Sequence, residues 1–310
     1  MAGTRREFIK ASGILGLGTL AGYGSTALAN DKPKEKRESN KSKIGLASYS
    51  YHLMITDRVK KGISKAETIA WILDKVKDLH LDGVQIGYSE LDEAVVKSFI
   101  DREGVYLELA MGTWNKKSLT KRMEIAVRMG ARSLRAFLIF DPLAWKRYDK
   151  EKPSLMKKLE EAAAIAEHFK VPLAIENHSD YAAWQIAELV GNIKSKYLGI
   201  CFDSGNPPSS YEDPVEAAKV VAPYTIQTHL RDFKIVHTDY GLRYEGVPLG
   251  DGIVDAPEIV RILKNNGPVE VLSIESAVRA NPSKSVEENL RYEDEGVYRS
   301  IEYARTKLGL

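Results

Sequence analysis

Four short apolar runs in the second half of the chain each end in one side chain that can bind a metal. The runs have the sequences PLAIENH (172–178), LGICFDSGN (198–206), IQTHLRDF (226–233) and VLSIES (271–276). The side chains concerned are Glu176, Asp203, His229 and Glu275. A buried carboxylate without a partner is costly, or its pKa rises until the group is neutral. Packing alone does not explain the repetition of this pattern in four successive strands. Three carboxylates that meet at one end of a sheet need a cation between them.

The ligand set indicates which ion would suit such a site. Three carboxylates with a neutral imidazole carry a formal charge of −3, and a divalent cation reduces it to −1. Oxygen-rich sites prefer hard or borderline ions, so we expect Mn²⁺, Mg²⁺ or Co²⁺, with Zn²⁺ as the alternative because of the imidazole. For each residue alone, a salt-bridged position at the rim of the fold is the competing interpretation. The hypothesis of a metal site depends on all four together.

The elements that carry these residues alternate between strand and helix from Lys43 onward. Apolar runs predict strands over 43–49, 83–87, 104–111, 133–140, 171–177, 198–203, 225–231 and 270–276. Amphipathic runs predict helices over 65–79, 91–103, 117–130, 155–169, 182–193, 214–222, 256–266 and 286–307. This alternation within one domain favours a parallel sheet closed into a (β/α)8 TIM barrel, whose active site lies at the C-terminal ends of the strands.

Helix starts and loop lengths support this spacing. Four predicted N-termini resemble capping boxes: Ser64 with Glu67, Asp213 with Glu216, Asp255 with Glu258, and Ser285 with Glu288. The longest insertions are 141–153 and 234–254. Both follow the C-terminal ends of strands, so we expect both to overhang the active mouth.

Residues 1–29 have the features of a twin-arginine export signal. An Arg-Arg pair at positions 5 and 6 precedes an apolar, Gly-rich stretch over 14–28, and Ala-Leu-Ala at 27–29 fits a cleavage site. The stretch is too short and too rich in glycine for stable membrane insertion, so we expect cleavage after Ala29 and a periplasmic protein. Residues 30–42 alternate in charge and predict a flexible linker before a single barrel domain over 43–310.

Composition excludes several classes of protein. The chain has 45 basic and 43 acidic residues, and removal of the signal leaves it formally neutral, without the basic stripe that a nucleic-acid partner would require. The single cysteine, Cys201, lies in an apolar run, which favours packing in the core. A phosphate-binding loop, a G-x-G-x-x-G turn and a G-x-S-x-G elbow are all absent, which argues against nucleotide chemistry and serine hydrolysis.

The candidate ligands indicate proton transfer on a sugar. A cation chelated by the hydroxyl and carbonyl oxygens of a sugar lowers the pKa of the C–H bond beside the carbonyl. One glutamate held at the metal can take that proton to give a metal-bound enediolate, and a second glutamate on the opposite face can return it. The product is an epimer or isomer. If a leaving group lies β to the carbonyl, the same intermediate expels it and the enzyme is a lyase.

The strings IENH, FDSGNP, THLRDFK, VPLGDGIVD and SIES resemble the xylose isomerase-like superfamily over essentially all of 43–310. More narrowly, they resemble its sugar-phosphate isomerase/epimerase and ketose 3-epimerase branch. The resemblance implies a TIM barrel in which Glu176, Asp203, His229 and Glu275 bind the metal. It also implies that Glu176 and Glu275 are the catalytic acid and base. Relatives often form dimers or tetramers, so a homo-oligomer is compatible with it.

Six residues are candidates for substrate binding: His178, Arg231, Asn206, His52, Trp114 and Glu245. His178 lies two positions beyond Glu176, and Arg231 lies two positions beyond His229, so each shares a strand face with a predicted ligand. Many members of the family that the chain resembles have a lysine at the position of Arg231. For the others the alternatives are a loop cap at Asn206, a packed imidazole at His52 and a hydrophobic lid contact at Trp114. Glu108 and Arg135 lie within strands, where we expect them to neutralise each other inside the barrel.

The leading functional hypothesis is a metal-dependent isomerase or epimerase acting on a small sugar in the periplasm. The alternatives are a lyase or dehydratase that acts on a keto-sugar or 3-keto-glycoside by β-elimination, and a non-catalytic sugar-binding barrel. An abasic-site endonuclease shares the barrel but uses a richer set of histidines than the six present here.

Overall fold

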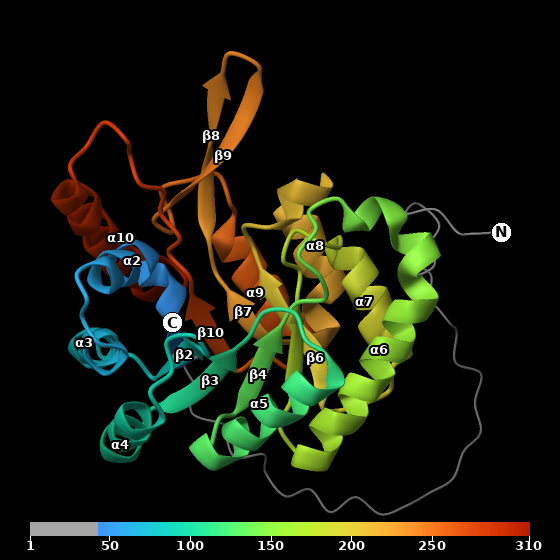
Figure 1. The fold of residues 1–310 in the computed structure, drawn as a ribbon. Helices are drawn as coiled ribbons and strands as arrows, with labels where there is room; N and C mark the ends of the chain where they lie inside the picture. The colour runs from blue at the N-terminus through green and yellow to red at the C-terminus, as the bar shows by residue number, and fades with distance from the viewer. Residues whose placement is uncertain (1–42) are drawn as a thin grey trace, which may run out of the picture. The chain divides into compact units, whose positions relative to one another are not determined.

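The computed structural model describes residues 43–310, and its ribbon is drawn in Figure 1. The predicted signal (1–29) and linker (30–42) lie outside the described residues. Within 43–310 no helix has both the length and the apolar character needed to cross a membrane.

Eight parallel strands form one sheet, in the order β10-β1-β2-β3-β4-β5-β6-β7. Their bounds are β1 (Lys43–Ala47), β2 (Gly83–Gly87), β3 (Tyr106–Ala110), β4 (Ser133–Ala136), β5 (Leu173–Glu176), β6 (Leu198–Asp203), β7 (Thr225–His229) and β10 (Val271–Ile274). Each strand is joined to the next through helical segments, so the predicted TIM barrel is confirmed.

The barrel closes between β7 and β10 through an unusual set of bonds. The ladder there is a single parallel bridge between Leu230 and Ile274, directly beyond the end of β7. The Leu230 N–H donates to the Ser273 carbonyl at 2.8 Å, and the Ser273 N–H donates to the Thr228 hydroxyl at 2.9 Å. A side-chain oxygen of Thr228 thus replaces a main-chain acceptor. This closure lies immediately beside His229 and Glu275.

The outer helices cover the sheet as expected from their amphipathic patterns (Figure 1). They are α3 (Lys65–Asp78), α4 (Glu93–Glu103), α5 (Lys116–Met129), α6 (Tyr148–Phe169), α7 (Ala183–Asn192), α8 (Pro214–Val221), α9 (Ala256–Asn266) and α10 (Val286–Lys307). The capping boxes predicted at Ser64 and Ser285 are confirmed with both bonds. Asp213 and Asp255 cap their helices, but their glutamates pair with Lys219 and Arg261 instead.

Two helical features were not predicted. Helix α2 (His52–Lys60) follows β1 after a short 3₁₀ turn, and its cap comes from another helix. The buried Glu293 carboxylate of α10 accepts the N–H groups of Leu53 and Met54 at 2.7 and 2.8 Å. Helix α6 begins before Pro153, so the predicted insertion after β4 is shorter than expected and contains a 3₁₀ turn at Ala144–Arg147.

The second predicted insertion contains an antiparallel hairpin, β8 (Asp232–Thr238) and β9 (Gly241–Val247), which projects from the barrel in Figure 1. Its base is fixed by the buried Asp232, whose carboxylate accepts four backbone N–H groups, from Phe233, Gly250, Gly252 and Val254. A Cβ atom on Gly252 would lie 2.1 Å from the Asp232 carboxylate, so that position requires glycine. These contacts explain why an aspartate is needed in the string RDFK and glycine in the string GDGIVD, which lie together at the base of the hairpin.

The predicted ion pair between Glu108 and Arg135 is wrong. Glu108 lies inside the barrel, where it accepts from the hydroxyls of Ser133 and Ser273 and has Arg132 at 4.0 Å. Arg135, on the next strand, points instead to Glu176 at 3.1 Å. Burial raises the pKa of Glu108 to about 7, although Arg132 and the two hydroxyls oppose the shift.

We predict that Glu108→Gln stabilises the protein above pH 7 but not near pH 4.5. The native state binds its proton up to about pH 7 and the unfolded chain only to about pH 4.5, so stability contributed by this group falls across that interval. The amide removes the cost of a buried charge, which we expect to raise the free energy of unfolding by about 1–3 kcal/mol at pH 8. Urea denaturation at both pH values measures the effect, and an equal change at both pH values contradicts it.

Candidate metal centre

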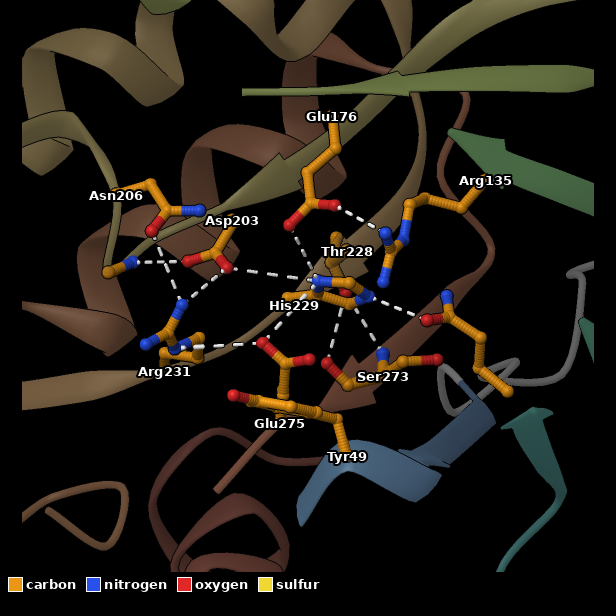
Figure 2. A network of polar contacts seen from close by, with 12 residues as sticks. Tyr49, Arg135, Glu176, Asp203, Asn206, Thr228, His229, Arg231, Ser273 and Glu275 are labelled. Atoms are coloured by element: carbon orange, nitrogen blue, oxygen red, sulfur yellow. Dashed lines mark hydrogen bonds and ion pairs between the residues drawn. The ribbon is translucent and has the colours of Figure 1, made fainter. Parts of the chain in front are cut away.

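The ends of four strands bring the candidate ligands together. Glu176, Asp203 and His229 are the last residues of β5, β6 and β7, and Glu275 follows β10 directly. All four side chains are buried, and Figure 2 shows them directed toward one another. Because adjacent strands of a parallel barrel end at the same face, residues far apart in sequence meet there.

The imidazole of His229 lies at the centre of the cluster. Its Nδ1 atom is 3.3 Å from Glu176 Oε1, 3.6 Å from Glu275 Oε2 and 3.8 Å from Asp203 Oδ2. Potential ligand atoms of Glu176, Asp203 and His229 all lie within 4.8 Å of one another. Among the described residues, Nδ1 has no hydrogen-bond partner.

The other ring nitrogen fixes the orientation of this imidazole. His229 Nε2 lies 2.8 Å from Gln85 Oε1, an acceptor, so Nε2 carries the hydrogen. In the neutral ring Nδ1 then presents its lone pair to carboxylate oxygens. That arrangement is repulsive unless a proton or a metal ion lies between them, so these residues fit a cation.

Two arginines join the cluster: Arg231, which was predicted to bind substrate, and Arg135, which was predicted to pair with Glu108. Arg231 Nη1 donates to Asp203 Oδ2 at 2.9 Å, and its Nε lies 3.6 Å from Glu275 Oε2. Arg135 Nη1 lies 3.1 Å from Glu176 Oε2. Figure 2 shows one guanidinium on each side of the carboxylates. Arg231 therefore contacts the ligands themselves, in addition to any substrate contact.

These neighbours set the ionisation of the cluster. Burial alone would raise the pKa of Glu176, but Arg135 and His229 lower it well below its ordinary value. Burial would also raise the pKa of Asp203, but the charge of Arg231 outweighs this effect and lowers it. Burial would lower the pKa of His229, but Cys201, Glu275 and Glu176 raise it well above its ordinary value. Glu176 and Asp203 are thus ionised, and the raised pKa of His229 favours a proton on the ring that a metal ion would displace.

The loops behind the ligands are held by reciprocal bonds. Asn177 spans β5 and β6, since its amide donates to the Asp203 carbonyl at 2.9 Å and its oxygen accepts the Asp203 N–H at 2.8 Å. The Ser204 hydroxyl accepts the Arg231 N–H and donates to the Arg231 carbonyl, both at 2.8 Å. These bonds fix Asp203 and Arg231 without using their side chains.

A cavity of about 460 Å³ opens beside the cluster, on the side of β1 to β4. Its lining includes Gln85 and Arg135 of the cluster, with Tyr49, Glu90 and Arg122. Tyr49 is 52% exposed at the rim of this cavity, and partial desolvation together with the charge of Glu275 raises the pKa of its hydroxyl. The volume suits a small polar molecule, and this face offers both donors and acceptors to it.

Three of the predicted substrate-binding residues lie at the rim. His178 stacks on Phe137, with ring centroids 4.0 Å apart. Asn206 Oδ1 accepts from Arg231 at 3.3 Å, which attaches it to the cluster. His52 begins α2 and stacks on Tyr49, and its Nδ1 lies 3.3 Å from Glu293, so it serves the helix rather than the metal ligands.

The structure places the other two away from the cluster. Trp114 is buried, and the ammonium of Lys158 lies 4.3 Å from its ring centroid, so it packs in the core instead of offering a free face to a sugar. Glu245 belongs to the projecting hairpin, where it pairs with Lys234 and Arg243. In residues 43–310 no described hydrogen bond or ion pair joins it to the metal ligands.

Sequence reasoning did not find Gln85, Arg135 or Tyr49 as site residues. Gln85 and Arg135 are polar side chains within otherwise apolar strands, which was the available signal. Their partners lie 144 and 41 positions away in the chain, at His229 and Glu176, so spacing alone does not connect them. Tyr49 directly follows β1, at the same end of the barrel as the ligands.

Residues 73–295 match the family described as xylose isomerase-like TIM barrel. The chain belongs to this family. It is 25% identical over 215 residues to the uncharacterized protein YihM of Escherichia coli (strain K12), a match that covers 67% of this chain and 64% of that protein. The matched region is thus less than two thirds of that relative.

Solved structures agree on the fold. An IOLI protein with a bound zinc atom superposes with a TM-score of 0.59 at 15% identity, covering 84% of this chain and 98% of that chain. A D-allulose 3-epimerase from Methylomonas sp. superposes with a TM-score of 0.62 at 11% identity, covering 86% of this chain and 98% of that chain. Several of the structural neighbours are thus ketose 3-epimerases.

We predict that Gln85→Leu weakens metal binding without removing any ligand. The substitution deletes the acceptor of the His229 Nε2 hydrogen, so the ring loses its fixed orientation and tautomer. We expect a loss of affinity of roughly 10–100-fold, measured by titration of the metal-free protein with Mn²⁺ or Zn²⁺. Gln85→Glu, which keeps an acceptor, is the matched control. Unchanged affinity in the leucine variant contradicts the role given to Gln85.

Proposed function

We propose that this protein is a metal-dependent sugar isomerase or epimerase that works by proton transfer between two glutamates. The observation that supports it best is the buried group of Glu176, Asp203 and Glu275 around His229 Nδ1, an atom without a hydrogen-bond partner among the described residues. The family and its ketose 3-epimerase neighbours are consistent with this reaction class.

The four ligands Glu176, Asp203, His229 and Glu275 would hold one divalent ion. When bound, the ion would supply Lewis-acid polarisation of a sugar carbonyl. Its identity is part of the proposal: the carboxylate-rich set favours Mn²⁺, Mg²⁺ or Co²⁺, whereas the imidazole and the zinc in the related IOLI structure favour Zn²⁺.

The positions of the two glutamates suit proton transfer at two faces of a substrate. Glu176 ends β5 and Glu275 follows β10, with β6 and β7 between them in the sheet. Figure 2 shows them reaching toward His229 from opposite sides. A sugar bound between them would lose a proton to one carboxylate and regain it from the other, which inverts or moves the stereocentre.

The ionised state of Glu176 supports its role as the base. Arg135 and His229 hold its pKa well below the ordinary value, so the carboxylate is in the ionised form that a general base requires, and the same contacts reduce its basicity. The cavity lined by Tyr49, Gln85 and Arg135 would hold the rest of the sugar. Its size favours a monosaccharide or a small glycoside.

We also propose that the protein acts in the periplasm. The support is the sequence alone, namely the arginine pair and apolar stretch of residues 1–29. Cell fractionation with N-terminal sequencing of the mature chain tests this proposal. A chain that starts at Asn30 in the periplasmic fraction would agree with it.

The proposed activity predicts exchange of one substrate proton with solvent. The metal-loaded protein is incubated with keto-sugars and keto-glycosides in D₂O, and the products are followed by mass spectrometry and NMR. We expect a sugar with an unchanged skeleton and one added deuterium. Removal of the metal by a chelator should abolish exchange, and Mn²⁺ or Co²⁺ should restore it.

Variants separate the alternatives. Glu275→Gln should lower the rate by roughly 100-fold or more, because a general acid or base commonly contributes that much. Glu258→Gln, at a partly exposed glutamate on α9 that pairs with Arg261, is the control and should leave the rate unchanged.

The products distinguish the alternative functions. Loss of water or of an aglycone would identify a lyase instead. Sugar binding with no exchange, and no effect of Glu275→Gln on binding, would indicate a non-catalytic barrel.

A further inference from the structure

The acidic cluster contains its own counter-charges. Three carboxylates, those of Glu176, Asp203 and Glu275, are opposed by the guanidinium groups of Arg135 and Arg231. With His229 neutral, as it must be to bind a metal, the three carboxylates and two guanidinium groups sum to a formal charge of −1, instead of the −3 of the ligands alone. A divalent cation therefore meets a cluster that is already largely neutralised.

Both arginines are fixed parts of the barrel. The side chain of Arg135 is 14% exposed and that of Arg231 is 24% exposed, while Glu176 and Asp203 are buried almost completely. Arg135 also donates to the Met111 carbonyl, at 3.3 Å. Counter-charges held in this way cannot be replaced by mobile salt ions.

Arg231 occupies the oxygen that a metal would need. Asp203 Oδ1 already accepts the Gly205 N–H at 2.7 Å, and Oδ2, the atom nearest His229 Nδ1, accepts from Arg231 at 2.9 Å. Arg231 is held there from the other side by Asn206, at 3.3 Å, and by the main-chain bonds to Ser204. A metal ion at Nδ1 must therefore share or displace this contact.

We propose that Arg135 and Arg231 are built-in counter-charges that hold the acidic ligands together without a metal and weaken the affinity of the centre for a divalent cation. Removal of either positive charge makes the pocket more attractive to a cation, because Coulomb energies inside proteins are poorly screened. The same removal leaves buried carboxylates without a partner in the metal-free protein, which destabilises it.

The charge balance has a consequence for substrates, which depends on the proposed function. With a divalent ion bound, the centre carries a formal +1, whereas the ligands and the ion alone would carry −1. A positive centre stabilises negative charge that develops on substrate oxygens during proton abstraction. The arginines thus weaken metal binding but strengthen the electrostatic stabilisation of the reacting sugar.

The test compares metal-free protein with and without each arginine. Arg231→Met and Arg135→Met are prepared with Arg132→Met as the control, an arginine of similar exposure that pairs with Glu108 and Glu270 instead of the ligands. Thermal unfolding of the metal-free proteins is measured first, and calorimetric titration with Mn²⁺ follows. We expect lower unfolding temperatures for the two cluster variants and Mn²⁺ binding at least roughly tenfold tighter than in the wild type. The control should bind Mn²⁺ like the wild type.

Lysine variants separate charge from geometry and cover the case in which a methionine variant does not fold. Arg231→Lys and Arg135→Lys keep the positive charge but lose the planar fork. If charge is what matters, they bind Mn²⁺ with wild-type affinity. Tighter binding in the lysine variants would show that the fork, and not the charge, controls the metal, and would overturn the proposal.

Other outcomes are also decisive. Weaker or unchanged Mn²⁺ binding in the methionine variants, with a wild type that does bind the metal, overturns the counter-charge proposal and leaves the proposed function intact. If neither the wild type nor the variants bind Mn²⁺, Co²⁺ or Zn²⁺, the metal-dependent function fails. The unfolding temperatures of the metal-free proteins then test whether the arginines hold the acidic residues together. If neither methionine variant has a lower unfolding temperature, that part of the proposal is also overturned.

Discussion

The site depends on the mutual repulsion of three buried carboxylates and on the positive groups that offset it. Glu176, Asp203 and Glu275 all approach one nitrogen of His229, within 3.3 to 3.8 Å. Such a group is unstable in a barrel core unless cations lie among its members. The protein provides two arginines and a protonatable imidazole for this purpose, and the arrangement has the donor groups that would suit a metal ion. The loops, the second-layer asparagine and the strand ends serve mainly to hold this balance in place.

The sequence was sufficient for the fold and for the acidic ligands because both follow local rules. Alternating apolar runs predict the barrel, and a charged residue at the end of each of the last four strands is visible without knowledge of contacts. Within residues 43–310 the eight predicted strands are all present and the four candidate ligands lie at one face, whereas the hairpin of β8 and β9 was not predicted. Two predicted capping boxes also form completely, since each depends on residues only three positions apart.

The rest depended on pairs that are distant in sequence. Arg135 was assigned to Glu108 because the two lie within neighbouring strands. In the register of β3 and β4, however, Glu108 lies opposite Ser133 and Arg135 lies opposite Ala110. Arg135 is therefore two residues nearer the C-terminal end of the barrel, where Glu176 ends β5. Helix α2 has no capping residue of its own, and its first N–H groups are satisfied by Glu293, about 240 positions later. Trp114 was a candidate for sugar stacking on residue type alone, and only the position of Lys158 over its ring shows otherwise.

Two of the candidate metal ligands lie at the place where the barrel closes. Strands β7 and β10 are joined by one bridge and by the hydroxyl of Thr228, in place of a full ladder. His229 lies on one side of this seam, between Thr228 and Leu230, and Glu275 lies on the other, where its N–H donates to the Leu230 carbonyl at 3.2 Å. An ion held by both would add a further link between β7 and β10, beside the bonds that already close the barrel. Metal binding would then reinforce this closure, so that metal supply would affect the stability of the fold as well as its chemistry.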